Sequence, residues 1–140
     1  MASKTNAIAD SSFILGVARP KDPSHTQCIA VFKQHSTIYL PQTTLAEVGY
    51  FLTKLGGNYV AADFLRRLPK MKYEPVSLKE EDFLRTADIL EQYGSTRLDF
   101  VDATIISIAE RLGISRILTL DRRDFSIIRP KHVDHFELLP

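Results

Sequence analysis

Hydrophobic residues along this chain alternate between short extended runs and longer stretches of helical period. In residues 43–57 the apolar positions recur every three or four residues up to a final glycine, which predicts an amphipathic helix. Runs rich in leucine and β-branched residues, such as 116–121, predict buried strands. The predicted strands are Asn6–Asp10, Thr37–Pro41, Arg116–Asp121, an extended piece at Lys72–Val76 and an edge strand at His135–Leu139. The predicted helices are Ser12–Ala18, His25–His35, Thr43–Gly57, Asn58–Pro69, Ser77–Gly94 (opening on a capping box of Ser77 with Glu80) and Leu98–Gly113 with its terminal glycine.

This order of elements predicts an α/β fold with a mostly parallel sheet, because strands and helices alternate along the chain. The length of 140 residues predicts a single domain over residues 1–140. Composition is ordinary for a globular protein, with 44% hydrophobic and 25% charged residues.

Charge and cysteine content exclude several classes of protein. The formal net charge is +1, so a polyanionic partner would have to be recognised by a local patch. Cys28 is the single cysteine, which excludes a disulfide scaffold and fits a reducing, cytoplasmic setting. The apolar run 7–18 is interrupted by Asp10 and two serines and is shorter than the ~18 residues of a membrane span. We therefore expect neither a membrane segment nor a signal peptide.

Acidic residues follow the predicted strands. Asp10 follows the first strand, Glu47 lies on the helix after the second, and Asp121 follows the run RILTL. Asp102 begins the helix that leads into that last strand, at the head of an apolar stripe. In parallel α/β sheets ligands bind beyond the carboxyl ends of the strands, so these four acids are expected to share one edge.

Taken singly, each acid also has a structural interpretation as part of a cap or a turn. A capping glutamate returns to the backbone at the helix start, and an aspartate before a helix accepts from its first N–H groups. These alternatives are a capping box of Thr44 with Glu47, an N-cap at Asp99 with Asp102 at N3, a cap at Asp10 and an Asx turn at Asp121.

The four acids together favour a metal site. Carboxylates a few ångströms apart repel one another unless they are protonated or a cation is present. Mg²⁺ and Mn²⁺ prefer carboxylate and water oxygens, which this chain offers. Zinc at His132 and His135 is a poor fit because no second pair of ligands accompanies them. Cys28 lies among small apolar residues, where a core role is the default rather than a nucleophile.

Four stretches of the sequence resemble the PIN-domain nucleases, and most of all the small toxin ribonucleases of VapBC-type toxin–antitoxin modules. The stretches are IADSSFIL, TLAEVGYFL, FVDATIISIAERLG and ILTLDRRDF, in this order along nearly the whole chain. The resemblance implies a three-layer α/β/α sandwich with a central, mostly parallel sheet. It also implies Mg²⁺- or Mn²⁺-dependent cleavage of RNA that leaves 5′-phosphate and 3′-hydroxyl ends, homodimerisation, and inhibition by a cognate antitoxin protein.

The resemblance also implies roles for individual residues. The acids of the family fall on Asp10, Glu47, Asp102 and Asp121. We assign Asp10 and Asp102 as the principal metal ligands, with Asp121 and Glu47 binding a second ion or orienting water. Hydroxyls that support the acids fall on Ser11 and Thr119. Asp99 lies where the family is not regularly acidic, so an N-cap is preferred to a metal ligand there, and Asp124 is expected to order the turn before Phe125.

An RNA substrate needs cations around the acidic pocket. The candidates for RNA binding are Arg19, Lys21, Arg122, Arg123 and Arg129, with Lys131, His132 and the stretch 66–72 in addition; a solvated basic face is the alternative for 66–72. Aromatic residues on the helices 43–57 and 58–69 are interpreted as core or dimer-interface residues rather than base-stacking platforms. We expect this helical hairpin to contribute to a two-fold interface and to antitoxin docking; its aromatics are Tyr50, Phe51, Tyr59 and Phe64.

Two rival functions remain. A phosphoacceptor receiver domain would have adjacent acids after the first strand and a lysine after a late strand, whereas this chain has ADSS and ILTLD. A catalytically idle PIN-like domain that binds RNA or protein would keep the fold without cutting. Metal-dependent cleavage separates the idle domain from the nuclease.

Overall fold

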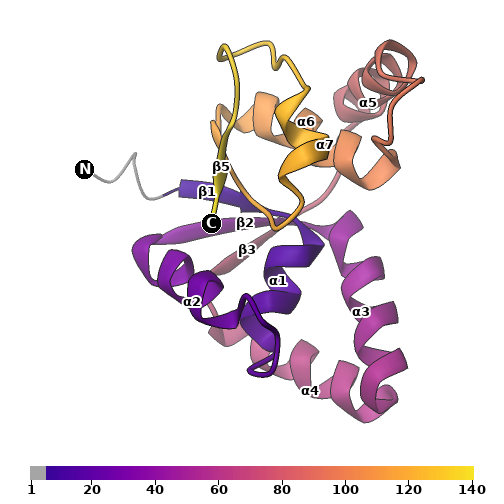
Figure 1. The fold of residues 1–140 in the computed structure, drawn as a ribbon. Coiled ribbons are helices and arrows are strands. Elements are labelled where there is room, and N and C mark those ends of the chain that lie inside the picture. The colour runs from indigo at the N-terminus through magenta and orange to yellow at the C-terminus, as the bar shows by residue number, and fades with distance from the viewer. Residues whose placement is uncertain (1–5) are drawn as a thin grey trace.

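A computed structural model describes residues 6–140 and contains one five-stranded sheet (Figure 1). All pairings are parallel and the strand order is β3-β2-β1-β4-β5. The predicted edge strand near the C-terminus is confirmed as the outermost strand, and the extended piece that contains Pro75 forms the opposite edge. The strands are β1 (Asn6–Ala9), β2 (Thr37–Pro41), β3 (Tyr73–Val76), β4 (Arg116–Leu118) and β5 (Glu137–Leu139).

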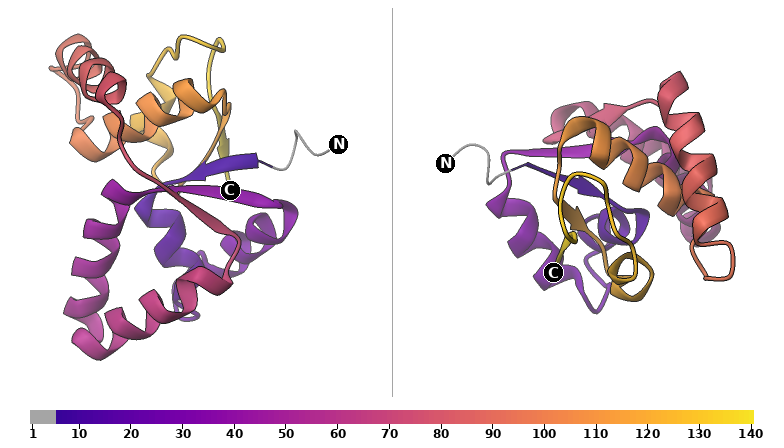
Figure 2. Two further views of the ribbon diagram at one scale, coloured as in Figure 1. Left: turned by 180° about the vertical axis from the view of Figure 1, so that it is seen from behind. Right: turned by 90° about the horizontal axis from the view of Figure 1, so that it is seen from above.

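Helices cover both faces of the sheet, as Figures 1 and 2 show from several sides. One face carries α1 (Ser11–Ala18), α2 (His25–Gln34), α3 (Gln42–Gly56) and α4 (Asn58–Arg67), followed by a short 3₁₀ helix η2 (Leu68–Lys70). The other face carries α5 (Glu80–Gln92), α6 (Phe100–Leu112) and α7 (Arg122–Ser126). Each face has its own hydrophobic core. The expected three-layer α/β/α sandwich is thus confirmed.

Helix α6 is the innermost helix of its layer. Residues 103–109 are buried without interruption, because α6 lies between the sheet and α5. Only the first and last turns reach solvent, and the helix ends at Gly113, whose φ of 70° is the left-handed conformation that favours glycine. The predicted helix and its glycine stop are confirmed.

Three local predictions were wrong. Helix α5 starts at Glu80, and Asp82 rather than Glu80 accepts from the backbone N–H of Lys79 (2.8 Å), so the Ser77–Glu80 capping box does not form. Strand β4 ends at Leu118 instead of continuing to residue 121. The residues after Asp121 form the short helix α7, so Asp124 lies within a helix rather than in a turn.

The sheet topology positions the acidic residues. Strand β1 is central, with β2 on one side and β4 on the other, so the chain order reverses direction at β1. The carboxyl ends of these three strands face the same edge of the sheet, and crevices at such switch points are the usual ligand sites of α/β sheets. Among residues 6–140, no helix combines the length and the hydrophobicity that crossing a membrane requires.

Candidate active site

Asp10 is the most enclosed acid of this edge. It lies directly after β1 as the N-cap of α1, and only 5% of it is exposed. Its Oδ1 accepts from the backbone N–H of Ser11 (2.8 Å), while its Oδ2 accepts from the hydroxyls of Ser12 (3.1 Å) and Thr119 (2.8 Å). Burial raises the pKa of Asp10 in spite of these hydrogen bonds, which act in the opposite direction. The residue is therefore both a cap and a rigidly held, buried carboxyl group.

Glu47 faces Asp10 across the hydroxyl of Ser11. Ser11 Oγ donates to Glu47 Oε1 at 2.7 Å and lies 3.5 Å from Asp10 Oδ1. Burial raises the pKa of Glu47, and the charges of Asp99 and Asp10 raise it further. The hydroxyl of Thr44 donates to the carbonyl of Pro41 instead of capping α3. The interpretation of Glu47 as half of a capping box was wrong, because its carboxylate binds Ser11.

Asp99 is the N-cap that the sequence suggested, and it forms a reciprocal capping box with Asp102 at N3. Asp102 N–H donates to Asp99 Oδ1 (2.9 Å), and Asp99 N–H donates to Asp102 Oδ2 (3.3 Å). A carboxylate at a helix start is ordinarily stabilised in its charged form. Burial and the charge of Asp99 instead raise the pKa of Asp102 to about 8, and Asp10 adds to the effect. Capping alone does not account for a carboxyl group in such an environment.

Thr119 joins Asp10 to the segment that carries Asp121. The buried Thr119 hydroxyl donates to Asp10 and accepts from the backbone N–H of Asp121 at 2.9 Å. The side chain of Asp121 is exposed and hydrogen bonded to Asp124, whose pKa is raised by burial and by this contact. Asp121 N-caps α7 without a side-chain bond, so the predicted Asx turn does not form. The structure thus anchors the backbone of Asp121 at the site while its carboxyl group faces Asp124.

The chemistry of this donor set fits a hard divalent cation. The main influences on Asp10, Glu47 and Asp102 are burial, hydroxyls, backbone amides and other carboxylates, with Asp99 acting on all three. No cation of residues 6–140 is among these main influences, and an ion that binds oxygen would stabilise carboxylates in such an environment. Within residues 6–140, however, no group of three or more histidine, cysteine, aspartate or glutamate side chains lies close enough together to enclose an ion.

Two cations follow α1, at the end of this helix opposite to Asp10. Arg19 is the C-cap residue of α1; its guanidinium pairs with Asp22 (3.3 Å) and lies 5.1 Å from the ring centre of Phe51. Lys21 is exposed in the turn that follows. Both remain candidates for RNA contact.

The cations after β4 have diverse surroundings. Arg122 donates through Nη1 to the carbonyl of Pro140 at 2.5 Å, which ties α7 to the C-terminus. Arg123 lowers the pKa of Asp124 through its charge, against the larger effect of burial. Arg129 is exposed, and its backbone N–H donates to the hydroxyl of Tyr93.

Three other basic residues were wrongly expected around the pocket. Lys131 N–H binds Glu110, and His132 Nε2 lies 2.7 Å from the carbonyl of Ile114, both at the end of α6 opposite to the acids. A 13-residue helix is about 20 Å long, so this end is remote from Asp102. Lys72 donates to the carbonyls of Phe32 and His35 and so caps α2.

Comparison with known proteins assigns the family. The sequence profile of the PIN domain matches residues 7–129, which include β4, all but the first residue of β1 and every acid described above. The chain belongs to the PIN-domain family. The chain is 27% identical over 136 residues to the ribonuclease VapC26 of Mycobacterium tuberculosis, covering 95% of this chain and 99% of that protein.

Solved PIN-domain structures share the fold of this chain. The sarcin–ricin-loop-cleaving toxin VapC20 of Mycobacterium tuberculosis superposes with a TM-score of 0.79 at 18% identity, covering 91% of this chain and 98% of the toxin. A toxin–antitoxin complex from Klebsiella pneumoniae matches with a TM-score of 0.67 at 15% identity, over 87% of this chain and 92% of that one.

Within this PIN domain, sequence reasoning undervalued Asp99. Its cap geometry was expected, but its charge also acts on the other three acids of the group. The signal was present in the spacing, since residues 99 and 102 lie one helical turn apart at the start of α6 and share a face. A like-charge pair at this spacing could have indicated a shared site.

Proposed function

We propose that this PIN domain is a metal-dependent endoribonuclease and the toxin of a toxin–antitoxin module. The observation that carries the proposal is the group of acids at the β1 switch point, with the pKa of Asp10, Glu47 and Asp102 raised together. The names of the relatives, a ribonuclease and an RNA-cleaving toxin, support the same substrate. We also propose a cytoplasmic setting, because the substrate would be RNA and the single cysteine, Cys28, is a free thiol.

The residues divide the chemistry among them. Asp10 and Asp102 would hold Mg²⁺ or Mn²⁺, with Glu47 and Asp121 as further oxygen donors. When bound, the ion neutralises charge on the phosphate and lowers the pKa of water. Hydrolysis adds water to phosphorus and breaks the P–O3′ bond, so O3′ takes up a proton and leaves as a 3′-hydroxyl, while the phosphate remains on O5′ of the following nucleotide. Ser11 and Thr119 orient the carboxylates for this reaction through the hydrogen bonds described above.

Other reactions have less support. Burial raises the pKa of the Cys28 thiol to about 11, so it is protonated at neutral pH and is a poor nucleophile. A catalytically idle PIN domain would have no use for this group of four acids, because their negative charges repel one another. Neutral residues at these positions would give a more stable protein.

The test is cleavage of a mixed RNA pool with Mg²⁺, with Mn²⁺ and with EDTA, followed by mapping of the ends. Asp10→Asn and Asp102→Asn each remove a charged ligand at constant shape, so we expect at least a hundredfold slower cleavage with RNA binding unchanged or stronger. The matched control is Glu91→Gln, an exposed acid of α5, which should cut as the wild type does.

Asp99→Asn refines the assignment. Asparagine caps a helix as well as aspartate does, so this variant should keep most of the activity if Asp99 acts as a cap. An Asp99→Asn protein as inactive as Asp102→Asn would place Asp99 among the metal ligands. An Asp102→Asn protein that cuts at the wild-type rate would contradict the proposed mechanism.

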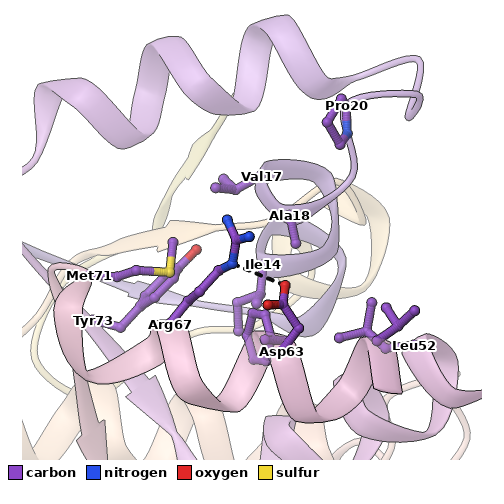
Figure 3. A pocket seen from close by; sticks show the side chains of 11 residues that line it. Ile14, Val17, Ala18, Pro20, Leu52, Asp63, Arg67, Met71 and Tyr73 are labelled. Carbon is purple, nitrogen blue, oxygen red and sulfur yellow. Dashed lines mark ion pairs between the residues drawn. The ribbon is translucent and has the colours of Figure 1, made fainter. Parts of the chain in front are cut away.

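We also propose that an antitoxin protein binds the hairpin of α3 and α4, as the resemblance implies. Between this hairpin and α1 lies a cavity of about 420 Å³ with largely apolar walls; Figure 3 shows Ile14, Val17 and Leu52 lining it. The Tyr73 hydroxyl is buried there with no hydrogen-bond partner among the described residues, and Arg67 pairs with Asp63 at the rim. An apolar segment with one polar group would fill this cavity and satisfy the phenol.

A further inference from the structure

Two aromatic side chains stand one helical turn beyond Glu47 on α3. Tyr50 and Phe51 are three and four residues after Glu47, so all three lie on the same side of the helix. Tyr50 is 69% exposed and Phe51 is 36% exposed. The sequence suggested core or interface roles for both, and the exposed ring of Tyr50 excludes the core role for that residue.

These rings form a shallow shelf that is continuous with the acidic group. A hollow of about 470 Å³ is lined by the two site residues Ser11 and Glu47 together with Leu15, Ala46, Tyr50 and Phe51. Ser11 is the residue whose hydroxyl binds Glu47 at 2.7 Å. An occupant of the shelf would therefore contact the same residues that hold the catalytic carboxylates in place.

A cation lies against each ring. Arg19 is 5.1 Å from the ring centre of Phe51, and Lys54 is 5.7 Å from that of Tyr50, both within the range of cation–π attraction. Lys54 is four residues after Tyr50, so acid, ring and cation follow one another along one edge of α3. Arg19 is shared with Asp22, whereas no ion pair of Lys54 is found among residues 6–140.

We propose that this shelf binds the base of an unpaired nucleotide next to the scissile phosphate, with Tyr50 as the stacking ring and Lys54 and Arg19 as phosphate contacts. The inference rests on the proposed function and assigns residues to the nucleotide beside the cut. Aromatic rings flanked by cations bind bases and phosphates together, and only an unpaired base can leave its stack to reach such a ring. A second copy of the chain fits less well, because its apolar surface would have to bury Glu47 further.

The experiment compares Tyr50→Leu, which keeps an apolar residue but removes the ring, with Tyr50→Phe, which keeps the ring. Loss of one stacked base should raise KM for single-stranded RNA roughly tenfold with kcat little changed, and Tyr50→Phe should behave as the wild type. Phe83→Leu, which removes an exposed ring on α5, is the matched control and should have no effect.

A binding measurement separates this inference from the proposed function. Single-stranded oligonucleotides with 2-aminopurine at successive positions are titrated with the Asp10→Asn protein in EDTA, where no cleavage is needed. If the 2-aminopurine fluorescence is quenched at one position of the oligonucleotide, and this quenching disappears in Asp10→Asn/Tyr50→Leu, the result supports base binding at the shelf even if the protein cleaves no RNA. The inference would be overturned by an equal KM for wild type and Tyr50→Leu or by unchanged quenching. It would also be overturned if light scattering showed that Tyr50→Leu converts a dimer to a monomer.

Discussion

At the scale of the residue, Asp102 shows how one side chain serves two opposing demands. Its position at N3 of α6 and its bond from Asp99 N–H favour the carboxylate, whereas burial and the charge of Asp99 favour the carboxylic acid. Burial prevails and raises the pKa from 3.8 to about 8. Without a cation at this site, the folded protein therefore holds a proton that the unfolded chain releases.

This proton predicts a pH dependence of stability with EDTA present. Between pH 4 and 8 the folded state binds more protons than the unfolded state, because the pKa of Asp102 is higher when folded. The free energy of unfolding should therefore decrease as the pH rises through this range, and the elevated pKa values of Asp10 and Glu47 act in the same direction.

Thermal melts from pH 5 to 8 measure the effect. Wild-type Tm should fall with pH more steeply than that of Asp102→Asn, and Mn²⁺ should raise wild-type Tm most at the upper end, since an ion that binds the native state stabilises it by mass action. Parallel pH profiles for the two proteins would show that the carboxyl group of Asp102 ionises normally.

At the scale of the element, α5 and α6 are joined by a polar seam. Arg111 Nε lies 3.0 Å from both carboxylate oxygens of Asp82, Arg85 binds Glu110 through two nitrogens, and the hydroxyls of Thr86 and Ser107 are 2.9 Å apart. Asp82 is only 2% exposed and also accepts from the backbone at the start of α5. The seam thus fixes the register of α5 on α6, the helix that presents Asp99 and Asp102 at its other end.

Removing one member of this seam should be costly. In Arg111→Met the carboxylate of Asp82 stays buried without its partner, so we expect a loss of about 3 kcal/mol in the free energy of unfolding. The double variant Arg111→Met/Asp82→Asn should recover part of that loss, because the buried charge is gone. Urea unfolding measures both, and a single variant within 0.5 kcal/mol or so of wild type would contradict the burial argument.

How far the elements could be predicted depended on their length. The long helices α3, α4 and α6 were predicted with ends close to those observed, because a periodic apolar face extends over several turns. The five residues of α7 are too few to show a period, and the start of α5 rests on Lys79 and Asp82, which lack the serine or threonine of the usual capping sequence.

The site could be predicted only as far as topology determines it. Placing acids after parallel strands follows from their order in the chain, and it indicated Asp10, Glu47 and Asp121, with Asp102 at the start of the helix that leads into the last strand. The pairing of Asp121 with Asp124 and the reach of the charge of Asp99 depend on tertiary burial, which no local pattern encodes.

At the scale of the whole molecule, exposed apolar residues gather on the hairpin of α3 and α4. Leu55 is 53% exposed, Leu65 55% and Tyr59 90%, although the net charge of the chain is only +1. Phe64 of the same hairpin is instead partly buried against the core. Apolar groups at such density favour contact with another protein surface.

We expect a homodimer that uses this hairpin. Light scattering at high micromolar concentration should give twice the mass of the chain, and Leu65→Glu should shift the protein toward the monomer, because the charge would be buried in the interface. Leu84→Glu, an exposed leucine of α5, is the control. A wild-type monomer at that concentration would exclude the dimer and leave the hairpin to the antitoxin.

Strand β2 ends at Pro41 and helix α3 begins at Gln42, with no residue between them. The direction in which each α3 side chain points around the helix axis is therefore determined by where strand β2 ends. One residue inserted in the first turn of α3 would rotate Glu47, Tyr50 and Lys54 together by about 100° about the helix axis. The segment from the sheet to Glu47 should consequently accept changes of residue type far more readily than any change of length.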